Sequence, residues 1–150
     1  MVAHSHVAWW KSLGLVFLPS LVVFVALDLT WITLFAGSVY KDVLGDYLTP
    51  QPRVVPGLLA WLCIVGAVYL FALPLSRTPA GAARQGALLG LGLYGCYEAT
   101  NLSILQRWTP ALAAVDTAWG CTACAAAAVV QLLLQRRLAA AAGAGPGGAL

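Results

Sequence analysis

Four long apolar segments make up most of this chain and limit what it can fold into. We place them at residues 12–37, 54–75, 80–105 and 110–134. Each is long enough to cross a bilayer, since a transmembrane helix needs about 20 predominantly apolar residues. Only 9% of the residues are charged, whereas a soluble domain has about 25%. The chain is therefore predicted to be an integral membrane protein, with the lipid bilayer as its surroundings.

Proline and polar residues separate the four segments. Thr49-Pro50-Gln51-Pro52 ends the first helical region, because proline lacks a backbone donor and restricts the residue before it. Thr78-Pro79 and Thr109-Pro110 each resemble an N-cap followed by proline at the first helical position. The short loops favour antiparallel neighbours. The expected fold class is all-α, an integral membrane four-helix bundle running up-down-up-down.

We expect residues 12–137 to form this bundle, between an interfacial segment at 1–11 and an Ala/Gly-rich tail at 138–150 that is disordered beyond its first turn. Four crossings place both termini on one side of the membrane. That side carries five basic residues and the other side three, which predicts cytoplasmic termini, or the equivalent organelle face, by the positive-inside rule. The two sets are Lys11, Arg77, Arg84, Arg136 and Arg137 against Lys41, Arg53 and Arg107.

Three of the apolar segments each contain one acidic residue. Asp28 lies nine residues before the end of the first segment, Glu98 seven before the end of the third, and Asp116 six after the start of the fourth. At about 1.5 Å per residue, all three lie roughly 6–14 Å below the same membrane surface. We therefore expect three carboxyls in one layer, in the leaflet opposite the N-terminus.

The acids are accompanied by aromatic and amide side chains at helical spacing. An acid that faces lipid costs about 2.5–3.5 kcal/mol, so these stripes are expected to face inward. Three carboxylates in one poorly hydrated layer cannot all ionise cheaply, so protons are shared or a cation enters. Arg107 and Lys41, on the adjoining loops, are candidate charge partners. The predicted ligand-binding or proton-handling cluster is Asp28, Trp31, Tyr94, Tyr97, Glu98, Asn101, Asp116 and Trp119.

The remaining motifs of the sequence do not indicate a metal, redox or nucleic-acid site. His4 and His6 are too few for a metal site, which is closed by about four ligands. Cys121-Thr122-Ala123-Cys124 resembles a redox pair, but it lies in an alanine-rich run where small packing residues are the simpler interpretation. The net charge is only +3 and no basic patch is present, so nucleic acid is not an expected partner. No metal is expected, and no cofactor is assigned.

Two motifs stand out within the predicted cluster: Tyr97-Glu98-x-Thr100-Asn101 and Asp116-x-x-Trp119-Gly120. Leu27-Asp28-x-x-Trp31, Tyr40, Leu44-Gly45, Gly66, Tyr69, Pro74, Gly86, Tyr94 and Trp108 accompany them. Over about residues 12–134 this series resembles a predicted membrane protein family, mostly bacterial, known as domain of unknown function 2177. Glu98 departs from that pattern, which has aspartate there. The resemblance implies four membrane helices, no established activity, and an association with lipid-modifying genes.

Three functions remain open from the sequence. The first is a pocket that binds a small or lipid-like molecule or a cation; if it is catalytic, one acid of the cluster would donate a proton. The second is an accessory subunit of a membrane complex, with the cluster as structural glue and an alanine-rich face of the fourth helix as the docking side. That face holds Ala118, Ala125 and Ala128. The third, an ion or proton pathway, needs polar residues through the other leaflet as well.

Overall fold

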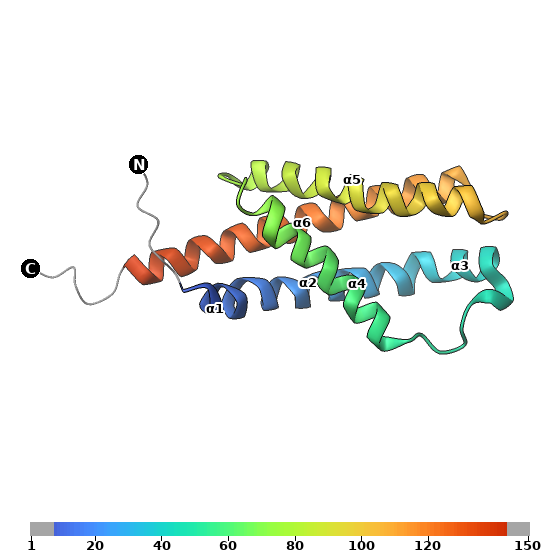
Figure 1. Ribbon diagram of the computed structural model, residues 1–150, viewed down its shortest axis with the longest axis horizontal. Coiled ribbons are helices and arrows are strands. Elements are labelled where there is room, and N and C mark those ends of the chain that lie inside the picture. Colours follow the sequence, from blue (N-terminus) through green and yellow to red (C-terminus); the bar gives the residue numbers. More distant parts are fainter. Residues whose placement is uncertain (1–7, 144–150) are drawn as a thin grey trace, which may run out of the picture.

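The computed structural model describes residues 8–143, which form four long helices and no β-strand (Figure 1). The first is one continuous helical rod made of α1 (Trp9–Ser12), the π-helical turn η1 (Leu13–Phe17), α2 (Leu18–Trp31), a second π-helical turn η2 (Ile32–Ala36), α3 (Gly37–Leu44) and the 3₁₀ turn η3 (Gly45–Tyr47). The others are α4 (Val54–Ala67) with its π-helical extension η4 (Val68–Ala72), α5 (Pro79–Ile104) and α6 (Pro110–Gly143).

Neighbouring helices run in opposite directions along the bundle (Figure 1). The rod that holds α1, α2 and α3 runs away from the N-terminal end, α4 returns, α5 runs out again and α6 comes back. The all-α antiparallel bundle expected from the sequence is confirmed. Which membrane side carries α1 and the end of α6 stays a prediction.

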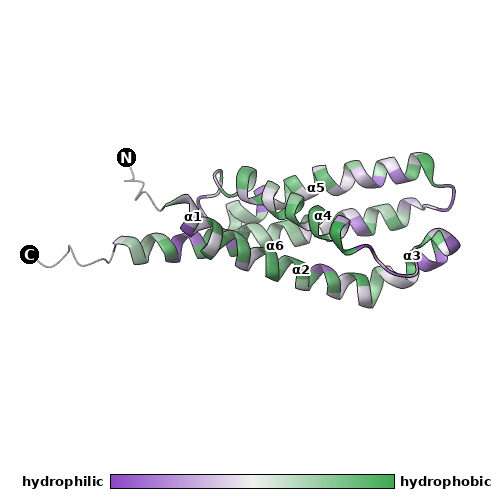
Figure 2. Ribbon diagram, turned by 60° about the horizontal axis from the view of Figure 1, so that its bottom comes forward, coloured by the Kyte–Doolittle hydropathy of each residue, from purple (hydrophilic) through white to green (hydrophobic). Residues whose placement is uncertain are grey.

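Three of the four helices are long and apolar enough to cross a membrane, namely Trp9–Tyr47, Val54–Ala72 and Pro110–Gly143. Between the described residues 8 and 143, α5 is the long helix outside this set, because its polar stripe and glycines lower its hydropathy. Figure 2 shows apolar colour along α2 and α4 and hydrophilic colour on α3 and the loop after it. The chain therefore has three or four helical spans.

Two helices extend past the predicted membrane spans. The first continues through α3 to Leu44 without a break, beyond residue 37, where the predicted span ends. α6 continues to Gly143, into the segment predicted as a disordered tail, because alanine is the best helix former and residues 139–142 are all alanine. Residues 144–150 of that tail, and 1–7 of the N-terminal segment, lie outside the described residues.

Proline is accommodated inside the first helix by a wider turn. Pro19 has no backbone N–H to donate, and it lies two residues after the end of η1. That turn is closed by the N–H of Leu18, which bonds to the carbonyl of Leu13. Local π-helical adjustments of this kind re-satisfy backbone groups inside membrane helices. Pro19 therefore leaves the rod continuous.

α5 and α6 form the closest helix pair, and glycines make this possible. A Cβ added at Gly86 would collide with the backbone of Cys124 and Ala125, and one at Gly90 with the backbone of Gly120 and Cys121. The spacing of these two glycines in the sequence predicts this close approach. Beside it lies the apolar core, in which Phe24, Val65, Val68, Cys124 and Ala128 are fully buried.

The predicted docking face on the fourth helix is not available to a partner as one surface. Ala128 is fully buried in the chain's own core, and Ala125 packs against Gly86 of α5. Ala118 alone of the three is exposed. The three alanines therefore do not form one exposed docking face, because Ala125 and Ala128 pack within the bundle.

The contact at Gly90 yields a stability prediction. We expect Gly90→Ala to lower the melting temperature in detergent, since the new methyl group would push α5 away from the α6 backbone. Gly92→Ala on the same helix has open space around it, and removing a mid-helix glycine there gains about 1 kcal/mol of helix propensity. Equal melting temperatures for the two variants would contradict the close packing.

Candidate functional site

The three acids of the membrane-spanning segments are all buried. Asp28 is 8% exposed, Glu98 1% and Asp116 5%. They come from α2, α5 and α6, in the half of the bundle that also contains α3 and the α5–α6 loop. A buried carboxyl needs hydrogen-bond donors to replace the water it has lost. The donors found here are mainly tryptophans.

Asp28 is held between two indoles. Its Oδ2 accepts a hydrogen bond of 2.7 Å from the Nε1 of Trp61, and its Oδ1 accepts one of 2.9 Å from the Nε1 of Trp119. Trp61 belongs to α4 and Trp119 to α6. One carboxyl on α2 therefore connects three helices.

Asp116 accepts from an indole and a phenol. The Nε1 of Trp31 donates to its Oδ1 over 3.4 Å, and the hydroxyl of Tyr40 donates to the same oxygen over 3.2 Å. The ring of Trp31 stacks on Trp119, with centroids 4.8 Å apart and planes 7° from parallel. The donor to one aspartate is thereby packed against a donor to the other.

Glu98 is the most deeply buried acid, and a loop residue covers it. The Nε1 of Trp108 donates to its Oε2 over 2.5 Å, and the Nδ2 of Asn101 donates to its Oε1 over 3.4 Å. We call Asp28, Glu98 and Asp116 with Trp31, Trp61, Trp108 and Trp119 the acid–indole cluster.

The α5–α6 loop places Trp108 over Glu98. Residue Thr109 caps α6, with its Oγ1 accepting from the N–H of Leu112 over 3.2 Å. The N–H of Trp108 bonds back to the carbonyl of Leu105 over 3.1 Å, which turns the chain tightly. The indole then stacks on Tyr40 of α3, with centroids 5.7 Å apart. This tight turn closes the cluster on the side of the loop.

A cavity of about 480 Å³ adjoins the cluster between α4 and α5. α5 packs on η4 but diverges from α4, which crosses the bundle obliquely (Figure 1). Asp28 and Asp116 line the cavity, and Glu98 does not. We call this space the α4–α5 cavity; its walls are Asp28, Trp31, Ile32, Tyr40, Ala60, Trp61, Cys63, Ile64, Leu93, Tyr94, Tyr97 and Asp116.

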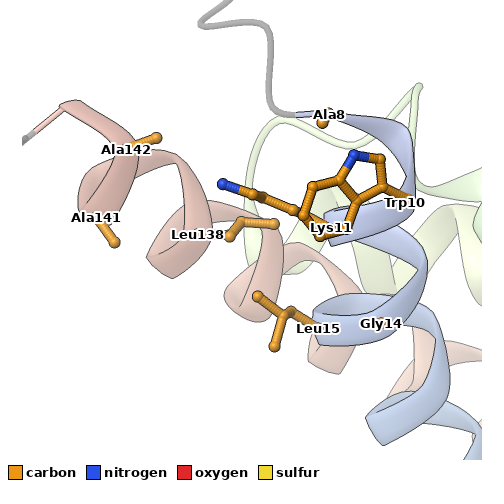
Figure 3. Close-up of a pocket in the computed structure, with 8 residues that line it drawn as sticks. All are labelled: Ala8, Trp10, Lys11, Gly14, Leu15, Leu138, Ala141 and Ala142. Carbon is orange, nitrogen blue, oxygen red and sulfur yellow. The ribbon is translucent and has the colours of Figure 1, made fainter.

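A second hollow lies at the opposite end of the bundle and has different walls. It measures about 620 Å³ and lies between α1 and the last turns of α6 (Figure 3). Lys11 is its charged group, and its ammonium lies 5.3 Å from the centroid of Trp10. The remaining walls are Ala8, Gly14, Leu15, Leu138, Ala141 and Ala142. Such a shallow apolar surface with a Trp–Lys pair suits a helix end at the membrane interface.

The structure brings most of the predicted cluster residues together. Asp28, Trp31, Glu98, Asn101, Asp116 and Trp119 are joined by the hydrogen bonds described above. Tyr94 and Tyr97 line the α4–α5 cavity, and the ring of Tyr94 fills the space left by Gly120. Lys41 and Arg107 are exposed, and within residues 8–143 no ion pair joins either to the three acids. Their role as charge partners stays a prediction.

Sequence reasoning missed three donors: Trp61, Trp108 and Tyr40. Trp61 carried a signal, because an indole N–H in the middle of an uncharged span needs a buried acceptor. Trp108 and Tyr40 lie outside the predicted membrane spans, and only the folded chain turns them back onto the acids. Four of the six tryptophans thus donate to a carboxyl.

A second polar group lies in the half of the bundle near α1. The hydroxyl of Tyr69 donates to Ser12 over 2.6 Å, and Ser12 donates to Gln135 over 2.9 Å. The Nε2 of the fully buried Gln131 donates to Ser20 over 3.1 Å, while its Oε1 has no partner within residues 8–143. The sequence analysis did not identify this group. The hydrogen bonds of this group join different helices, as is common in membrane bundles.

Among the described residues, no three His, Cys, Asp or Glu side chains gather so that they could hold a metal ion. The sequence model of a family described as Predicted membrane protein (DUF2177) matches residues 13–133. The chain belongs to this family. No curated protein and no solved structure matches the chain. In this DUF2177 protein, then, the residues and their geometry are the basis for inferring function.

Asp28 offers a test of how much the cluster stabilises this DUF2177 protein. Both its oxygens accept from indoles, and an asparagine has only one acceptor, so Asp28→Asn leaves one indole N–H facing an amide N–H. We expect the free energy of unfolding to fall by about 1–3 kcal/mol, the cost of an unsatisfied buried donor. Unfolding in detergent by titrated denaturant measures it.

The matched control is Asp42→Asn, at an exposed position on α3. Surface changes of this kind stay within about 0.5 kcal/mol. If Asp28→Asn were as stable as Asp42→Asn, the two indole hydrogen bonds would not contribute to the stability of the folded bundle.

Proposed function

We propose that this protein binds a lipid-like molecule in the α4–α5 cavity, with the polar end of the ligand against Asp28 and Asp116. The observation that carries the proposal is the cavity itself, because it joins two buried carboxyls to the outer face of the bundle. Ligand sites in helical bundles are commonly built between helices from apolar walls and a few polar groups.

The position of the cavity favours entry from the bilayer. Ala60 and Cys63 on α4, and Leu93 and Tyr97 on α5, line the cavity and are exposed on the outside of the bundle. These residues lie inside helices, away from the loops at either end. A ligand with an apolar tail can therefore pass between α4 and α5 while its tail stays in hydrocarbon.

The burial of three acidic side chains in one bundle also supports a binding role. Asp28, Glu98 and Asp116 are all at least nine-tenths buried, at a membrane depth where ionisable residues are rare and usually functional. Structural glue explains the indole bonds, but it does not require a cavity beside them. The cluster can hold the bundle together and still present two carboxyls to a ligand.

An ion or proton pathway is less well supported. Polar residues do occur in the other half of the bundle, at Ser20 and Gln131. Between them and Asp28, however, lie Phe24 on α2 and Cys124 on α6, each 0% exposed and part of one apolar core. A continuous file of water would have to cross this close-packed apolar layer.

Filling the cavity tests the binding proposal. We expect Cys63→Trp to remove bound lipid, because Cys63 is exposed at the rim of the cavity and a tryptophan there occupies the space. Native mass spectrometry of protein extracted in a mild detergent would detect lipid adducts on the parent and their loss from the variant.

Cys96→Trp serves as the matched control, since Cys96 is also exposed within a span but does not line the cavity. It should retain the adducts. If Cys63→Trp and Cys96→Trp carried the same adducts as the parent, the lipids would be bound elsewhere and the proposal would be wrong.

A further inference from the structure

We propose that the polar end of this ligand is an organic ammonium group, held against aromatic faces and the carboxyls of Asp28 and Asp116. The inference rests on the proposed function and assigns the chemical class of its ligand. Aromatic rings and buried carboxyl oxygens meet in the α4–α5 cavity, and both attract a positively charged group.

The aromatic walls form the first part of the argument. Five aromatic side chains line the cavity: Trp31, Tyr40, Trp61, Tyr94 and Tyr97. They come from α2, α3, α4 and α5, and so approach the cavity from several directions. Aromatic rings attract cations through their electron-rich faces, and cages of such rings are a common way to bind quaternary ammonium groups.

The two carboxyls supply the charge. The Oδ1 of Asp116 accepts from both Trp31 and Tyr40, and among the described residues no indole or phenol donates to its Oδ2. Each oxygen of Asp28 accepts one hydrogen bond, Oδ2 from Trp61 and Oδ1 from Trp119. With no lysine or arginine paired to them within residues 8–143, these acids can offset the charge of a bound cation.

The same groups select against other head groups. An anionic head would face two carboxyls at the cavity wall. A bare metal ion prefers several oxygen ligands, whereas most of this wall is aromatic ring and aliphatic side chain. An ammonium carrying methyl or alkyl groups is a cation whose outer surface is apolar, and this matches the walls.

Isosteric amphiphiles test the head group directly. Dodecyltrimethylammonium and dodecyldimethylamine oxide share one tail, but only the first is cationic at pH 8. Each would be titrated into the protein in neutral detergent, with tryptophan fluorescence as the readout because Trp31 and Trp61 line the cavity. We expect the ammonium to bind about tenfold more tightly, the scale of a desolvated cation–π contact.

Tyr97 provides a variant outside the hydrogen-bonded cluster. It is 57% exposed and lines the cavity. Tyr97→Leu should remove most of the preference for ammonium, while Tyr97→Phe, which keeps the ring, should retain it. Tyr47→Leu, at a residue that is 95% exposed and outside the cavity, should behave as the parent.

The outcomes separate this inference from the proposed function. If both amphiphiles bound equally and Cys63→Trp abolished both, the cavity would bind lipid but the ammonium assignment would be wrong. If Cys63→Trp changed neither titration, both proposals would be overturned. Tetramethylammonium binding as tightly as the dodecyl compound would identify a free organic cation as the ligand, which upholds the ammonium assignment and overturns the lipid-like tail.

Discussion

A carboxyl inside a membrane bundle has lost its water, and the rest of this structure depends on how that loss is offset. Indole N–H groups replace the water: each of the three buried acids accepts from at least one tryptophan. These bonds cross between elements. Asp28 connects α2 to α4 and α6, Asp116 connects α6 to the first helix, and Glu98 fastens the α5–α6 loop. The acid–indole cluster is therefore one of two sets of interhelical hydrogen bonds in the bundle, and it is the set that contains the carboxyls.

The two halves of the bundle are packed in different ways, and the cavity follows from that difference. Near η4, small residues such as Gly86 and Ala128 let the helices approach closely around Phe24. Near the acids, α4 diverges from α5 (Figure 1), and aromatic rings line the space beside them. A space lined by rings and carboxyls results. Its chemistry suits an amphiphilic cation better than a polar solute, because most of its surface is apolar.

Much of the fold was predictable because its causes are local. Long apolar segments require helices in a membrane, and the Thr78-Pro79 cap marks the start of α5 where the structure has it. The layer of acids was also predictable, since helix rise converts sequence position into depth. The donors were less so. Trp108 reaches Glu98 only through a tight loop, and Tyr40 reaches Asp116 because α3 continues the first helix past the predicted membrane span.

The sequence by itself determined the membrane class, the four antiparallel helices, the acids of the buried layer and the glycines at which another helix can approach α5. Hydropathy, proline position and helical period are properties of the chain. Only the tertiary structure decided which donor each acid uses, and that Glu98 is sealed while Asp28 and Asp116 face a cavity. It also decided that the alanine face of α6 is used within the bundle. The physical reason is that helix tilt and rotation depend on packing between segments far apart in sequence.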